Sequence, residues 1–274
     1  MEFQDKFIAF IDILGFKSLI ERAEKGEGKT VTEISEILAK LGSSDDLERI
    51  RRHGPSMCPH SPCLQKDIDF QLTQISDCVI ISTEVSPLGI INLISHCWGA
   101  VFSLLNDGLM CRGYITRGSI YHTKFQIIGS GYQNAYQMES QVSAFKTEAD
   151  ERGTPFVEID PEVVNYISSN ADACIQKMMA RMTESDGNVT ALYPIARLGH
   201  SFMIAGPGIE FDPEKEIASN NNVRAHIYTL QNKLMSFVDE SKPSAIKKTM
   251  YYMNALDEQL KRCEKTDEVI NAFR

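Results

Sequence analysis

The sequence predicts an α+β fold, in which a mixed sheet carries helices on one face and a mixed C-terminal extension rich in helix follows. Two observations lead to this prediction. Apolar stretches with strand and helix periodicity alternate over the first 150 residues in the order β-α-α-β-β-α-β-β-α. The hydrophobic content of 43% and charged content of 24% are those of an ordinary globular protein.

The first strand is expected over residues 5–14, where the segment FIAFIDIL is almost wholly apolar. Helical spacing follows in LGFKSLIERAEKG and again in VTEISEILAKL, which ends near residue 41. Residues 41–66 are polar and contain several prolines, so we interpret them as a variable insertion.

A β-hairpin is expected over residues 70–82, because FQLTQI and CVIIS are strand-like segments on either side of Ser76-Asp77. Residues 87–107 have helical spacing and stop at Asn106-Asp107-Gly108. Two more strands, LMCRGYITRGSIYH and FQIIG, and a helix over residues 131–149 complete the first domain, residues 1–150.

Residues 151–274 are interpreted as an α/β extension that packs on the first domain. PFVEID and ALYPIARLGHSFMIAG are typical of strands, and residues 161–184 and 214–265 are typical of helices.

The charge balance argues against a nucleic-acid or membrane surface. The net charge is -9, and both partners need basic patches. No window of 18 consecutive apolar residues and no signal peptide is found, and seven irregularly spaced cysteines suit reduced thiols. We therefore expect a cytoplasmic protein.

Two acids interrupt apolar strands next to turn-forming residues, Asp12 in the first strand and Asp77 in the hairpin. Asp is common as a turn cap, and this reading stays open for each acid. Together, two carboxylates on adjacent strands can hold divalent ions, and Gly15-Phe16 would place a helix N-terminus, which binds phosphate groups, beside them.

These motifs resemble those of the class III nucleotidyl cyclases. FIAFIDILGF is similar to their first metal motif, QISDCVIIS to the second, and IIGSGYQNAYQMES to their glycine-led helix. The resemblance covers residues 5–148. It implies a ferredoxin-like or palm-like sheet and a homodimer with active sites at the interface. It also implies two Mn²⁺ or Mg²⁺ ions on Asp12, Asp77 and the Ile13 carbonyl, with Gly15 and Phe16 binding substrate.

The chain departs from the purine cyclases of this family at four positions. The base-reading positions are Gln71 and Gln126, and the Asn and Arg of the glycine-led helix are replaced by Gln133 and Gln137. For the missing cation, the candidates are two arginines of the preceding strand, Arg112 and Arg117, because guanidinium groups clasp phosphate oxygens.

This combination resembles the pyrimidine cyclases of the Pycsar anti-phage system. That resemblance implies a phosphorus-oxygen lyase that converts UTP, or else CTP, to a cyclic nucleotide sensed by a separate effector. A glutamine can pair with either base, and we favour UTP. The alternatives are a purine cyclase and a catalytically inactive nucleotide-binding regulator.

One further cluster, in RRHGPSMCPHSPC, has the residue types of a zinc site: His53, Cys58, His60 and Cys63. Its compact, proline-rich spacing lacks a second cysteine pair, so an insertion loop is the default interpretation.

Overall fold

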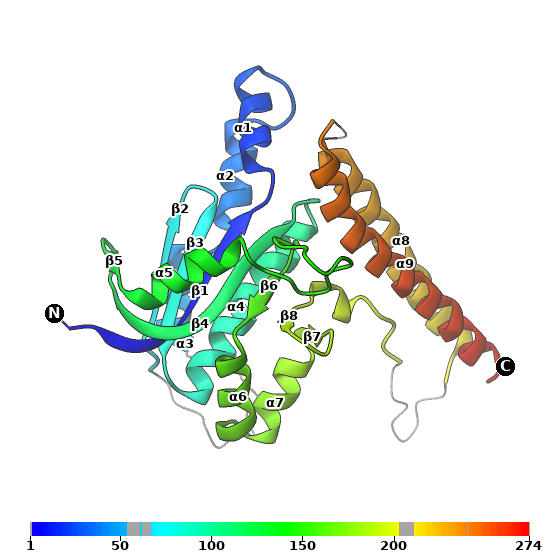
Figure 1. The fold of residues 1–274 in the computed structure, drawn as a ribbon. Coiled ribbons are helices and arrows are strands. Elements are labelled where there is room, and N and C mark those ends of the chain that lie inside the picture. The colour runs from blue at the N-terminus through cyan, green and yellow to red at the C-terminus, as the bar shows by residue number, and fades with distance from the viewer. Residues whose placement is uncertain (1, 54–60, 62–66, 203–210, 240, 274) are drawn as a thin grey trace. The chain divides into compact units, whose positions relative to one another are not determined.

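The structure is a computed structural model that describes residues 2–53, 61, 67–202, 211–239 and 241–273. It divides into two compact units, one made of residues 1–104 and 109–194 and the other of residues 105–108 and 195–274. The first unit contains an eight-stranded mixed sheet and the helices packed on it (Figure 1). The predicted α+β class is confirmed.

The strands of the first unit are β1 (Gln4–Ile13), β2 (Phe70–Ile75), β3 (Cys78–Glu84), β4 (Cys111–His122), β5 (Ile127–Ile128), β6 (Val157–Ile159), β7 (Thr183–Ser185) and β8 (Thr190–Leu192). Its helices are α1 (Phe16–Glu24), α2 (Val31–Ala39), α3 (Ser44–His53), α4 (Pro87–Leu105), α5 (Ser130–Glu139), α6 (Pro161–Asn170) and α7 (Ala173–Ala180). A short 3₁₀ helix over Pro194–Arg197 follows.

The sheet order is β2-β3-β1-β4-β6-β8-β7, with β5 paired to β4. The N-terminal strand β1 therefore lies in the middle, antiparallel to both β3 and β4. Strand β6 lies parallel to β4 and extends the same sheet. The sheet thus continues past residue 150, where the sequence suggests a domain boundary, because β6, β7 and β8 complete its edge.

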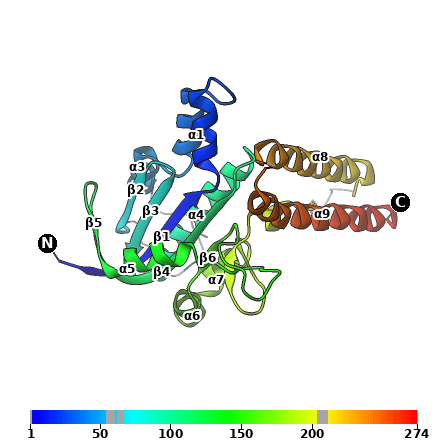
Figure 2. The same cartoon turned by 45° about the horizontal axis from the view of Figure 1, so that its top comes forward.

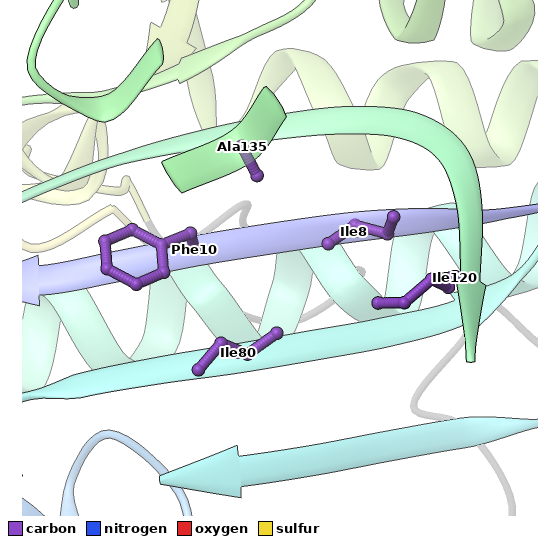
Figure 3. Packing of buried hydrophobic residues seen from close by; sticks show 5 residues of the cluster. All are labelled: Ile8, Phe10, Ile80, Ile120 and Ala135. Atoms are coloured by element: carbon purple, nitrogen blue, oxygen red, sulfur yellow. The ribbon is translucent and has the colours of Figure 1, made fainter. Parts of the chain in front are cut away.

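The two faces of the sheet carry different helices. Ile8 and Phe10 of β1 point to one face of the sheet. There they pack with Ile80 of β3, Ile120 of β4 and Ala135 of α5 (Figure 3). Phe7, one residue earlier, points to the opposite face and meets Tyr166 of α6 with ring centroids 5.0 Å apart. Alternate residues of a strand face opposite sides, so β1 contributes to the core on both.

Helix α4 is the most apolar helix of the first unit. Its mean hydropathy of 1.7 over 18 residues makes it long and apolar enough to cross a membrane by composition alone, and 72% of that window is buried. Core helices of globular domains have the same composition, and α4 lies behind the strands in Figure 3.

Helix α5 ends at Glu139, ten residues before the predicted end at 149. The chain turns there, because the Val142 carbonyl accepts hydrogen bonds from the backbone N–H groups of Gly153 and Thr154 at 2.7 and 3.1 Å. Residues 140–153 therefore form a loop that closes on itself next to the C-terminal end of α5.

The second unit contains two long helices, α8 (Pro213–Phe237) and α9 (Pro243–Asn271), side by side in Figures 1 and 2. They are antiparallel, since Gln231 donates to Asp257 at 2.7 Å and Asn220 donates to Asp267 at 2.7 Å. The helices predicted for residues 214–265 are thus present as a hairpin.

Candidate active site

The structure brings the two predicted acids together at one end of the central strands. Asp12 is the penultimate residue of β1 and lies opposite Cys78 of β3 and Arg112 of β4. Asp77 occupies the turn that joins β2 to β3, and its carbonyl accepts a hydrogen bond from the Ile13 N–H at 3.1 Å. This bond fixes the tip of the hairpin against the end of β1.

The turn itself is strained at one residue. Ser76 has a φ of 54°, in the left-handed region that most residues avoid, and this conformation lets the β2–β3 connection close in two residues. Asp77 follows directly and is half-buried.

The environment of Asp12 disfavours its ionised form. Burial raises the pKa of this carboxyl to about 7, and repulsion from Asp77 and then Glu139 adds to the rise, while Arg112 partly opposes it. A pair of carboxylates that repel each other in a partly buried site is an arrangement that a cation relieves.

The chain leaves β1 through Gly15, which caps α1 with a φ of 79°. A Cβ at this position would meet no atom within 4 Å among the described residues, so glycine is needed for its conformation and not for space. No side chain caps α1, and the first N–H groups of a helix have no acceptor within it. The N-terminus of α1 therefore has backbone N–H groups that could bind an anionic group, and the phosphate-binding role expected for Gly15 and Phe16 stays a prediction. Phe16, the first residue of α1, is buried, and only its backbone is available for that purpose.

A third carboxylate, Glu139, joins the site and was not predicted. It is the last residue of α5, only 7% exposed, and it forms an ion pair with the Nε of Arg112. The AYQMES motif contains this residue, but the sequence gives no sign of its partner, because the contact depends on the packing of α5 against β4.

The donor set suits a hard divalent cation. Asp12, Asp77 and nearby backbone carbonyls offer oxygen ligands, which Mg²⁺ and Mn²⁺ prefer. Within the described part of the chain, no three His, Cys, Asp or Glu side chains form a metal-binding group. Any ion here would therefore be bound by the carboxylates of Asp12 and Asp77. The Ile13 carbonyl, water or substrate oxygens would complete its coordination.

Arg117 does not join this site within one chain. It lies five residues after Arg112 on β4 and so points to the opposite face of the sheet. There its guanidinium donates to Asp5 at 2.7 and 3.0 Å and lies 5.9 Å from the ring centroid of Tyr166.

Of the four glutamines, Gln71 also lies apart from Asp12. Gln71 of β2 pairs with Ser82, and Ser82 pairs with Ile8, four residues from Asp12, a separation of about 13 Å along a strand. The remaining three, Gln126 beyond β4 and Gln133 and Gln137 on α5, are exposed.

A second polar cluster, also not predicted, lies on the α5 side of the sheet. Lys6 is 3% exposed and forms an ion pair with Asp69 at 2.5 Å. His122 lies between two hydroxyl groups, those of Ser82 at 2.8 Å and Thr73 at 3.0 Å. Burial first and the Lys6 charge second lower the pKa of His122 to about 4, so the imidazole is neutral.

The zinc hypothesis is not tested, since Cys58, His60 and Cys63 lie outside the described residues.

Comparison with known proteins gives likenesses among solved structures. No family model matches the chain, and no curated relative matches it. Among solved structures, the chain is similar to the catalytic core of a rhodopsin-guanylyl cyclase with converted specificity, determined in complex with ATPαS. The two are 13% identical over 70% of this chain and 93% of that one, with a TM-score of 0.36. A likeness at this identity and TM-score does not indicate a function. A functional assignment has to rest instead on the side chains around Asp12.

Proposed function

We propose that the chain is a nucleotidyl cyclase that converts a nucleoside triphosphate to its 3′,5′-cyclic monophosphate and pyrophosphate. One observation carries the proposal: Asp12 and Asp77 meet at the end of adjacent strands, where burial and then repulsion from Asp77 raise the pKa of Asp12 to about 7. A turn cap has no need of a second acid beside it, whereas a site for divalent ions does.

The chain's own residues divide the work of this reaction. Asp12, Asp77 and the Ile13 carbonyl would hold two divalent ions. When bound, these ions lower the pKa of the ribose 3′-hydroxyl and neutralise the triphosphate. Gly15 and the N-terminus of α1 receive phosphate oxygens through backbone N–H groups. The 3′-oxygen bonds to the α-phosphorus, the bond to the bridging oxygen breaks, pyrophosphate leaves, and the hydroxyl proton passes to solvent.

A homodimer is part of the proposal. Gln71 and Arg117 are remote from Asp12 in one chain, so a second copy is needed to bring either of them to the substrate. Large apolar side chains are exposed on this unit, among them Ile75 and Tyr136, which are 53% and 57% exposed. Both lie near the acids, Ile75 next to the hairpin turn and Tyr136 against Phe10. Covering such side chains favours association.

The substrate that we propose is a pyrimidine nucleotide, UTP in preference to CTP. Gln71 and Gln126 carry no charge, and an amide offers one donor and one acceptor to a pyrimidine edge. The product would act in the cytoplasm as a messenger in anti-phage defence, sensed by a separate effector.

Incubation with each of the four nucleoside triphosphates and Mn²⁺, with products identified by mass spectrometry, tests the proposal. Cyclic UMP or cyclic CMP with pyrophosphate is expected, and Asp12→Asn and Asp77→Asn should abolish it. Asp5→Asn, at the other end of β1, is the matched control and should retain turnover. Cyclic AMP or cyclic GMP would assign the chain to the purine cyclases. Nucleotide binding without any turnover would make it a regulator.

A further inference from the structure

The guanidinium of Arg112 lies next to Asp12 but is paired elsewhere. The two residues are directly opposite each other on β4 and β1, so their side chains share a face with Cα atoms about 5 Å apart. The ion pair of Arg112 is nevertheless with Glu139. Among the residues that the structure describes, the Asp12 carboxylate forms no ion pair.

Two contacts hold Arg112 in this position. Its side chain is 17% exposed, and that of its partner Glu139 is 9% exposed, so the pair is largely shielded from water. On another side, the backbone of Gly153 passes so close that a Cβ there would lie 2.7 Å from the Arg112 Nη1. The loop that carries Gly153 is itself fixed by the Val142 carbonyl.

We propose that Glu139 is a positioning residue that keeps Arg112 away from Asp12 and so leaves the Asp12 oxygens available to a divalent ion. A partly buried guanidinium needs a carboxylate, and Asp12 is the next one within its reach once Glu139 is removed. An Arg112–Asp12 pair would occupy the oxygens that the ion requires. This inference rests on the proposed function, since it assumes that Asp12 is a metal ligand.

The charges of the cluster agree with this role. Asp12, Asp77 and Glu139 contribute three negative charges when ionised, against one positive charge from Arg112. The remaining excess of two negative charges lies on Asp12 and Asp77, because Glu139 and Arg112 compensate each other. A divalent ion balances that excess.

Direct binding of Mn²⁺ to the nucleotide-free protein, followed by electron paramagnetic resonance, tests the inference. Glu139→Leu should weaken Mn²⁺ binding by about tenfold or more, which corresponds to about 1.4 kcal/mol. The double variant Arg112→Met/Glu139→Leu removes the competing cation as well and should restore binding to near the wild-type value. Circular dichroism confirms that each variant is folded, and Glu139→Gln replaces Glu139→Leu if the latter does not fold.

The outcomes separate this inference from the proposed function. If the wild-type protein binds no Mn²⁺, or if Asp12→Asn binds it equally well, the metal site itself is refuted. If the wild-type protein binds Mn²⁺ through Asp12 but Glu139→Leu has the same affinity, only the role of Glu139 is refuted. A double variant as weak as Glu139→Leu would also overturn it, because Arg112 would then not be the competitor.

Discussion

Replacing Asp12 with asparagine should stabilise the metal-free protein at high pH, although the same change abolishes turnover. The folded protein raises the pKa of Asp12 from 3.8 to about 7, so it binds a proton more tightly than the unfolded chain does. Stability is therefore greatest when this group is protonated in both states, and it falls as the pH rises from 3.8 to about 7. Asparagine does not ionise, so the Asp12→Asn variant does not lose this stability as the pH rises.

The size of the effect follows from the same shift. Each pH unit between the two pKa values costs about 1.4 kcal/mol, so ionised Asp12 lowers the free energy of unfolding by about 4 kcal/mol at pH 8. At pH 5 the cost is only about 2 kcal/mol, because the folded carboxyl is still protonated. The advantage of Asp12→Asn should thus grow by about 3 kcal/mol between pH 5 and pH 8.

Urea unfolding at both pH values, in the presence of a chelator, measures this difference. Asp5→Asn is the matched control at the exposed end of the same strand and should show no gain that grows with pH. Asp77→Asn should produce part of the gain, because it removes a charge that raises the pKa of Asp12. An Asp12→Asn variant that is less stable than wild type at pH 8 would refute the reasoning and would support a turn cap.

Three other perturbations test the surrounding structure. Protonation of His122 should cost about 3 kcal/mol between pH 7 and 4, because its pKa is lowered from 6.5 to about 4, so the stability of His122→Gln relative to wild type should rise by that amount over this range in urea titrations. Asp69→Asn should cost about 3 kcal/mol in the same assay, since it leaves the buried Lys6 ammonium unpaired, and Lys6→Met in that background should recover most of it. Gly129→Ala should lower the thermal midpoint, because its φ is 151° and a Cβ would lie 2.3 Å from a carbonyl oxygen of β4. The control Gly99→Ala, in helix α4 with open space around it, should raise that midpoint.

Local patterns predict the central part of the fold and the positions of the two acids. The apolar segment around Asp12 and the two-residue turn at Asp77 each reveal a strand end without knowledge of the rest of the chain. The two acids lie close together because β2 and β3 form a local hairpin and β3 also pairs with β1.

Contacts between distant segments could not be predicted. Glu139 meets Arg112 only because α5 folds back over β4, and β6 joins the sheet only through a parallel crossover after that helix. Arg117 is different, because its position was accessible from the sequence. Two residues five apart on one strand face opposite sides, so Arg112 and Arg117 cannot both serve a site on one face within one chain.

The central position of β1 has a consequence for the synthesis of the protein. This largely apolar strand is synthesised well before one of its two partners, β4, which follows about a hundred residues later. Until Cys111–His122 has been made, one edge of β1 stays unpaired, and exposed apolar edges promote aggregation. We therefore expect the yield of the protein to depend on chaperones that bind β1 before β4 has been made.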